Sequence, residues 1–183
     1  MGALELERLD GAGTRSCFAE IQAVYAEAFP DYDLADHERR TSRQTESSGF
    51  EAVIARIDRV LVGFVYGLPL SAGTGWWAGL EPPPPPGFTT ETGARTFAVI
   101  DLAVTPSCRG RGIGRRLMDE LLRPRREDRA TLATAPHERQ VQQMYERWGW
   151  RKVGRAPGGV GETEPWFDLY VIALRPEPAS SSR

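Results

Sequence analysis

Lysine is almost absent from this chain, because Lys152 is the only lysine among its 23 basic residues. With many Ala, Gly and Pro residues alongside, this bias toward arginine is typical of a GC-rich genome and does not by itself indicate a function. The formal net charge is −2, so no global electrostatic field favours DNA or an anionic lipid surface. An anion-binding site would therefore have to come from a local concentration of arginine.

Cysteine and histidine are also scarce, with two residues of each type. Cys17 and Cys108 have no neighbouring Cys or His at metal-ligand spacing, so they support neither a disulfide framework nor a zinc site, and we expect reduced thiols and no metal. No partner motif accompanies His37 or His137, so both are predicted to lie at the surface.

Long apolar runs are missing too. None approaches the roughly 20 residues that span a bilayer, which excludes a membrane-spanning helix. The first ten residues lack the basic flank and apolar stretch of a secretory signal, so we expect a cytoplasmic protein. Its 183 residues fit one domain, predicted over 1–175, with a flexible tail at 176–183.

Apolar spacing predicts an opening strand around Leu4 to Leu9, then a Gly-Ala-Gly turn at 11–13 and one helix ending near Pro30. A polar helix is expected over 33–46, followed by a hairpin of strands 50–57 and 60–70 joined at Asp58-Arg59. The five prolines Pro82 to Pro86 make the following segment an exposed connection. The remaining expected elements are strands at 96–104, 129–135, 150–153 and 167–174, with helices through Leu117 to Leu122 and over 136–148.

The most informative segment runs from Ile100 to Met118, where an apolar strand leads through a turn rich in glycine and arginine into an amphipathic helix. The first amides of a helix lack intrahelical partners, glycines let a ligand approach the backbone, and the helix dipole favours negative charge. Arginine can grip phosphate oxygens with two donors. The pattern therefore predicts a phosphate-binding site.

Three kinds of phosphate ligand fit such a loop, and residue spacing separates them. A P-loop ends in Gly-Lys-Ser/Thr, whereas this helix opens with Gly114-Arg115-Arg116. A dinucleotide site needs Gly-x-Gly-x-x-Gly and an acidic residue ending the next strand, and both are missing here. The remaining pattern, Arg-x-x-Gly-x-Gly over residues 109–114, resembles the coenzyme A motif of the GNAT acetyltransferase superfamily.

The resemblance is strong over residues 96–154, including the helix that ends Met144-Tyr145-Glu-Arg-Trp148-Gly149-Trp150. It implies an α+β (α/β/α) fold: a mixed, mostly antiparallel sheet of about six or seven strands, splayed between the fourth and fifth strands and flanked by about four helices. It further implies an enzyme that moves an acetyl group from acetyl-CoA to a primary amine in a ternary complex. The implied cofactor-binding residues are Leu102, Ala103, Val104, Arg109, Gly110, Arg111, Gly112, Ile113, Gly114 and Arg115.

Chemistry at the amine requires a base, because an alkylammonium has a reference pKa of about 10 and must lose a proton before it attacks. Asp101 on the strand before the loop is the first candidate, with Glu91 just upstream as a second; the family often places its carboxylate differently. Tyr145 matches the tyrosine that protonates the departing thiolate in many members. Seven residues earlier, Glu138 replaces the family's usual Asn, so that cofactor contact is not carried over.

Substrate contacts are expected from the regions least like the family, namely Tyr32, Trp76, Trp77 and Glu91, since acidic and aromatic groups suit a cationic amine. We expect a small-molecule amine as partner, no nucleic acid or membrane, and a monomer or homodimer. A peptide or protein amine, or a non-catalytic acyl-CoA-binding role, remain the alternatives. Structural roles also stay open for Asp101, Tyr145 and the two tryptophans.

Overall fold

The computed structural model describes residues 2–159, 162 and 164–175, and the predicted tail at 176–183 lies outside them. The chain divides into two compact units. The first unit runs to Leu68 and includes Val99–Arg125; the second comprises Pro69–Ala98 and continues from Arg126. The seven strands follow the order β1-β2-β3-β4-β5-β7-β6. In the described part of the chain, no helix is long and apolar enough to cross a membrane.

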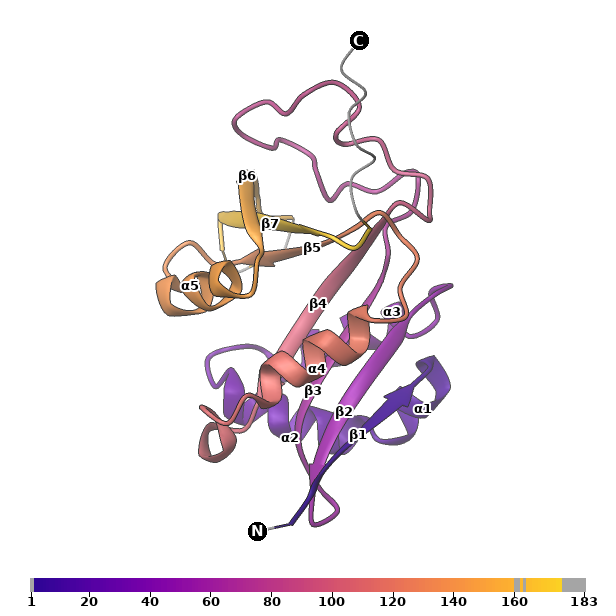
Figure 1. Cartoon of the computed structure of the whole chain (residues 1–183), viewed down its shortest axis with the longest axis vertical. Coiled ribbons are helices and arrows are strands. Elements are labelled where there is room, and N and C mark those ends of the chain that lie inside the picture. Colours follow the sequence, from indigo (N-terminus) through magenta and orange to yellow (C-terminus); the bar gives the residue numbers. More distant parts are fainter. Residues whose placement is uncertain (1, 160–161, 163, 176–183) are drawn as a thin grey trace. The chain divides into compact units, whose positions relative to one another are not determined.

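The strands of the first unit form an antiparallel meander that continues into β4 (Figure 1). Asp58 and Arg59 join β2 to β3 with positive φ values of 50° and 68°, as a two-residue hairpin turn requires. The predicted hairpin is therefore confirmed. The strands are β1 Leu4–Leu9, β2 Glu51–Ile57, β3 Val60–Pro69 and β4 Thr96–Val104.

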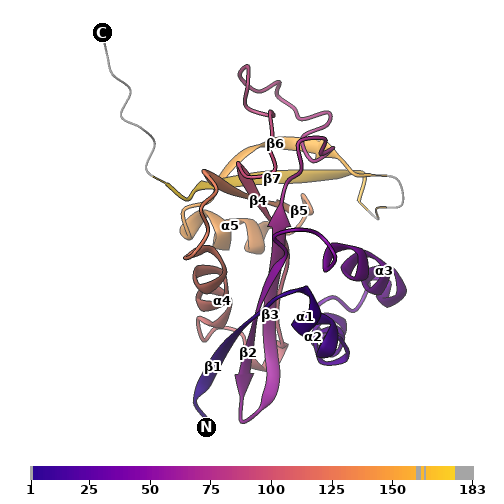
Figure 2. The same ribbon diagram turned by 90° about the vertical axis from the view of Figure 1, so that its right-hand side faces the viewer.

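Helices cover both faces of this meander. Figure 2 shows α1, α2 and α3 on one side of β1 to β3 and α4 on the other. The helices are α1 Gly11–Ser16, α2 Phe18–Ala28, α3 Leu34–Gln44 and α4 Ile113–Leu122. Between them, the aromatic residues Tyr25, Phe64 and Tyr66 are almost fully buried, together with Ile21 and Val24.

The predicted Gly-Ala-Gly turn at 11–13 is wrong, because these residues form the start of α1. The side chain of Asp10 accepts a hydrogen bond from the amide of Gly13 at 2.8 Å, which is the cap that a helix beginning at Gly11 needs. Cys17 then separates α1 from α2, so the single predicted helix is two. The described residues thus hold five α-helices, one more than expected.

The second unit contains the first residues of β4 and three further strands with one helix. Thr96 to Ala98 pair in parallel with Arg129 to Thr131, and the register extends no further although β4 continues to Val104. All other registered neighbours are antiparallel, so the predicted mixed sheet is confirmed. The elements are β5 Arg129–Thr134, α5 Arg139–Arg147, β6 Arg151–Pro157 and β7 Trp166–Ala173.

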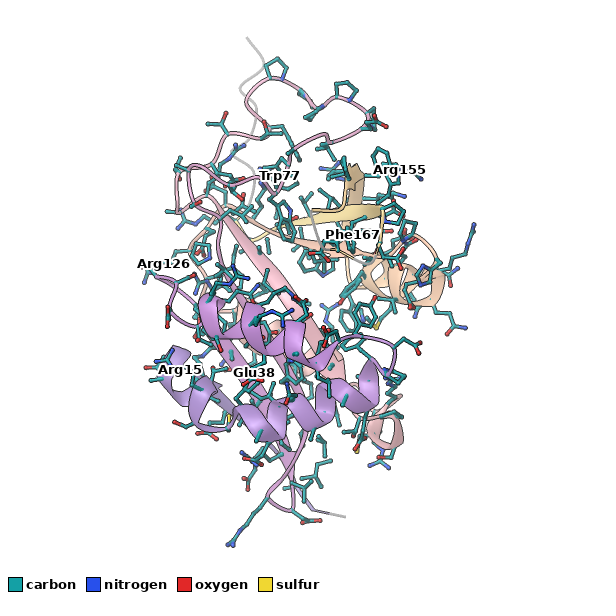
Figure 3. All side chains as sticks on the ribbon, turned by 180° about the vertical axis from the view of Figure 1, so that it is seen from behind. Arg15, Glu38, Trp77, Arg126, Arg155 and Phe167 are labelled. Atoms are coloured by element: carbon teal, nitrogen blue, oxygen red, sulfur yellow. The ribbon has the colours of Figure 1, made fainter. Side chains whose placement is uncertain are left out.

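The long connection between β3 and β4 has no strand of its own, as the prolines predict. It is more ordered than a solvated loop, because Trp77 and Leu80 are 5% and 6% exposed. Glu81, directly before the prolines, forms an isolated antiparallel bridge to Arg155 on β6. Figure 3 labels Trp77 in this connection.

Candidate active site

The segment from β4 to α4 begins with a short 3-10 turn, Pro106–Cys108, directly after the strand. The amide of Thr105 donates to the carbonyl of Val62 at 2.9 Å, which ties the end of β4 to β3. Arg109 folds back on the strand and donates from Nε to the carbonyl of Val104 at 3.1 Å. The turn is therefore fixed at both of its ends by hydrogen bonds to strands.

Two glycines give the loop its shape. Gly110 and Gly112 have φ values of 74° and 75°, a left-handed conformation that other residues rarely adopt. A Cβ built at either position would meet no atom within 4 Å, so the backbone here faces open space. A ligand could therefore approach the main chain closely.

Gly112 is also the N-cap of α4, and no side chain in the described part of the chain caps this helix end. The first backbone bond of the helix runs from the amide of Arg116 to the carbonyl of Gly112, at 3.0 Å. The amides of Ile113 and Gly114 precede it, at positions where a helix offers no intrahelical acceptor. Uncapped amides beside two open glycines are the donor set that a diphosphate requires.

The arginines around this loop are all exposed. Arg115 pairs with Asp119 one turn along α4 at 2.9 Å, in a surface ion pair that adds little stability. Close packing holds the helix in place: a Cβ at Gly63 would lie 3.0 Å from the carbonyl oxygen of Ala103 and 3.1 Å from the side chain of Leu117. Gly63 thus lets β3 approach β4 and α4, a role that its position in a strand does not reveal.

Asp101 lies on β4, three residues before its end, and its side chain is 15% exposed. The hydroxyl of Tyr66 donates a hydrogen bond to its Oδ2. His37 on α3 places Nε2 at 3.7 Å from the same oxygen and 3.1 Å from the Tyr66 hydroxyl. The carboxylate predicted as the base is therefore the exposed end of a buried polar cluster.

The prediction that His37 lies at the surface is wrong, because the residue is 0% exposed. Its ring stacks on Tyr25, with centroids 3.6 Å apart and planes inclined by 8°. The signal was present in the sequence but weak: α3 has few apolar residues, and His37 and Thr41, four residues apart, form its buried face. His137, by contrast, is exposed as predicted.

Burial controls the protonation of this cluster. Desolvation lowers the pKa of His37, although Asp101 acts in the opposite direction. Burial and then Asp101 raise the pKa of Tyr66 well above its ordinary value, and the same causes raise the pKa of Tyr25 to about 12. Near pH 7 the imidazole is therefore neutral and both phenols keep their protons.

The second unit holds the predicted site residues Tyr145, Trp76, Trp77 and Glu91. Tyr145 on α5 is 8% exposed, and its ring meets Trp148 and Trp150 edge-on at centroid distances of 5.6 and 6.0 Å. Trp76 donates from Nε1 to the hydroxyl of Thr131 at 3.1 Å. Both side chains are thus held by contacts within their own unit.

Glu91 and Trp77 belong to one buried network. Oε1 of Glu91 accepts hydrogen bonds from Trp77 Nε1 at 2.9 Å, Thr96 Oγ1 at 2.8 Å and Arg129 Nη2 at 3.1 Å. The guanidinium of Arg129 also lies over the rings of Trp77 and Phe88, at 4.9 and 4.3 Å from their centroids. Glu91 and Trp77 thus contact other residues of the protein. Their substrate-binding role stays a prediction.

Of the remaining predicted substrate contacts, Tyr32 lies in the first unit after α2. It is 39% exposed and meets Phe29 edge-on at 5.7 Å. The first unit also holds Asp101, the backbone of Leu102 to Val104 and the 109–115 loop, all within one segment of fifteen residues, 101–115. Across the residues that the structure describes, no group of three or more His, Cys, Asp or Glu side chains is placed to hold a metal ion.

The family model described as the acetyltransferase (GNAT) family matches residues 15–150. No curated protein matches the sequence. Among solved structures, the ribosomal-protein-S18-alanine N-acetyltransferase from Escherichia coli has a TM-score of 0.68 at 9% identity, over 99% of this chain and 100% of that one. Aminoglycoside 6'-acetyltransferase type Ii has a TM-score of 0.68 at 18% identity, over 95% and 99%. An aminoglycoside 6'-N-acetyltransferase complexed with coenzyme A has a TM-score of 0.66 at 18% identity, also over 95% and 99%.

Proposed function

Since the chain belongs to the GNAT acetyltransferase family, which makes it a GNAT-type acyltransferase, we propose that it moves the acetyl group of acetyl-CoA to a primary amine of a small molecule. Transfer takes place by direct attack in a ternary complex. The protein acts in the cytoplasm as a monomer or homodimer.

The observation that carries this proposal is the open, uncapped N-terminus of α4. Gly110 and Gly112 leave the backbone exposed, and the amides of Ile113 and Gly114 lie in the first turn of the uncapped helix. Arg109, Arg111 and Arg115 add positive charge on the surrounding surface. These residues fit the diphosphate of coenzyme A, since amides, dipole and guanidinium groups all favour an anion at this point.

The strand before the loop provides the other contacts. The main chain of Leu102, Ala103 and Val104 holds the pantetheine arm as an added strand would. When bound, acetyl-CoA supplies the activated acetyl group and the thiolate leaving group. A backbone amide near Val104 stabilises negative charge that develops on the acetyl oxygen.

Two side chains handle protons in this proposal. Asp101 takes a proton from the substrate ammonium, which frees the amine lone pair. Tyr145 donates a proton to the departing sulfur, a role assigned from the family's motif, and a neutral phenol is suited to it near pH 7.

The acceptor is proposed to be a small cationic amine because exposed acidic and aromatic side chains follow α2. Asp31, Tyr32 and Asp33 are all exposed, and Asp101 presents a carboxylate on the same unit. Acidic and aromatic groups together attract an ammonium. Two similar solved structures carry aminoglycoside acetyltransferase names, while a third carries the name of an enzyme for a ribosomal protein.

A thiol-release assay with acetyl-CoA and a panel of amines tests the function. We expect several small amines or aminoglycosides to accelerate coenzyme A release far above its rate without an acceptor. Faster release with peptides alone would replace the small-molecule acceptor by a peptide amine. Tight acyl-CoA binding with no acceleration by any amine would indicate a non-catalytic binding role.

A further inference from the structure

The two oxygens of Asp101 have different environments. Oδ2 accepts the hydrogen bond from Tyr66 and faces His37. Oδ1 has no hydrogen-bond partner within the described residues, and it is not among the polar atoms sealed from solvent. One carboxylate oxygen is therefore fixed by a hydrogen bond to a buried side chain, and the other faces the surface.

The Tyr66 hydroxyl has a single proton to donate, and this fixes the direction of each of its hydrogen bonds. A phenol has one proton and two lone pairs, and the proton goes to Asp101. The lone pairs then accept from His37 Nε2 at 3.1 Å and from Thr41 Oγ1 at 3.0 Å. This arrangement uses the full capacity of the hydroxyl and requires the Nε2-protonated tautomer of His37.

Packing keeps His37 in that form. The imidazole stacks on the rings of Tyr25 and Phe18, whose centroids are 3.6 and 5.5 Å away, and its Nδ1 is buried without a hydrogen-bond partner among the residues that the structure describes. A second proton on Nδ1 would bury a charged donor with no acceptor, which is costly. The neutral ring is therefore a fixed donor to Tyr66.

We propose that Tyr66, oriented by His37 and Thr41, is a positioning residue that holds Asp101 so that Oδ1 receives the ammonium of the amine substrate. This inference rests on the proposed function, in which Asp101 is the base. One proton passes from the substrate nitrogen to Oδ1, and the electron pair of the broken N–H bond stays on nitrogen. Tyr66 keeps its proton throughout, since its bond to Oδ2 orients the carboxylate without taking part in the transfer.

The remaining charged groups of the cluster are compatible with this arrangement. Arg40 on α3 pairs through Nε with Asp36 at 2.8 Å. Burial lowers the pKa of Arg40 while Asp101 and Asp36 raise it, with a net rise, so it stays a cation. The positive charge of Arg40 balances the negative charge of the cluster. Tyr66 remains the hydrogen-bond donor to Oδ2 of Asp101.

A double-mutant cycle separates positioning from simple packing. The kcat/KM for the best amine is measured in wild type, Tyr66→Phe, Asp101→Asn and the double variant. We expect Tyr66→Phe to lower kcat/KM about tenfold in wild type but less than about twofold in the Asp101→Asn background, because the phenol acts through the carboxylate. An equal loss in both backgrounds would make Tyr66 a packing residue and overturn the proposal.

Two variants at position 37 provide a matched pair. His37→Phe keeps an aromatic ring stacked on Tyr25 and Phe18 but removes the donor, whereas His37→Gln keeps an amide donor and loses the ring. If orientation of Tyr66 matters, His37→Gln retains more kcat/KM than His37→Phe, relative to the folded fraction seen by circular dichroism. The reverse order would assign the role of His37 to stacking.

A spectroscopic measurement tests the hydrogen-bond directions without turnover. The ¹⁵N chemical shifts of the His37 ring at pH 7 should show a neutral imidazole protonated on Nε2, and a proton on Nδ1 would overturn the arrangement. The activity data also separate the two proposals. If amines accelerate thiol release and Asp101→Asn lowers kcat/KM but Tyr66→Phe does not, the positioning inference fails alone; if no amine is acetylated by wild type, both fail.

Discussion

The side chain of Arg109 donates from Nε to the carbonyl of Val104, the last residue of β4, at 3.1 Å. This hydrogen bond links a side chain in the turn between β4 and α4 to the backbone at the end of the strand. The first arginine of the predicted phosphate motif therefore helps to shape the loop as well as adding charge to it. The backbone amides of Ile113 and Gly114 follow it in the first turn of α4, whose N-cap is Gly112.

Replacing Gly112 with Asp should weaken coenzyme A binding at least about tenfold, because it sets a negative charge against an anion site. The substitution also strains the backbone at φ 75°. Gly87→Asp is the matched control: this glycine has φ 80°, equally open surroundings, and a place in the 71–95 connection. Calorimetry with coenzyme A should show a large loss of affinity for Gly112→Asp only. Equal affinity in both variants would mean that coenzyme A does not bind at the N-terminus of α4.

Tyr145→Phe should lower kcat about tenfold or more while leaving the dissociation constant of coenzyme A nearly unchanged, because only the proton donor is lost. The phenyl ring preserves the edge contacts to Trp148 and Trp150. Tyr170→Phe serves as the control, since this second buried phenol bonds Glu146 on α5. Unchanged turnover in Tyr145→Phe, measured by thiol release, would make Tyr145 a packing residue.

The sequence predicted those elements in which local chemistry and burial agree. Asp58 and Arg59 join two apolar runs and form the expected turn. Pro124 follows α4 as a helix stop, and the glycines at 110 and 112 adopt the left-handed conformation that favours glycine. At these points short-range rules decide the structure, so they can be read without knowledge of the fold.

The prediction failed at one local cap and at one contact between residues distant in sequence. Gly11 begins a helix because the Asp10 side chain caps it, although Gly-Ala-Gly is typical of a turn. His37 is buried because Tyr66, 29 residues later, offers a hydroxyl beneath it. The sequence does not reveal the role of Tyr66, since nothing in its neighbourhood shows that Asp101 lies beside it.

Glu91→Ala should destabilise the second unit by about 3–5 kcal/mol, because it leaves the buried guanidinium of Arg129 without its carboxylate. The side chains of Glu91 and Arg129 are 0% and 11% exposed. All five tryptophans lie in the second unit, so the urea midpoint from tryptophan fluorescence reports on this unit. The exposed Glu81, in the same connection, gives the control variant Glu81→Ala, whose midpoint should stay near that of wild type. A raised KM for the amine with an unmoved midpoint would instead support the substrate contact that the sequence predicts.

The free energy of unfolding should fall as the pH drops from about 6.5 toward 5.5, partly because of His37. Its pKa is lowered in the folded state by burial, against the opposing effect of Asp101. Below the unfolded pKa of about 6.5, the unfolded chain binds a proton that the folded chain does not, so stability is lost on acidification, by at most about 1.4 kcal/mol per pH unit. Urea unfolding followed by circular dichroism at several pH values measures this slope.

His37→Gln should flatten the slope, while His137→Gln, at an exposed site, should leave it as in wild type. Identical slopes in wild type and His37→Gln would mean that the buried imidazole takes up its proton without unfolding, and its fixed role as a neutral donor to Tyr66 would then be wrong.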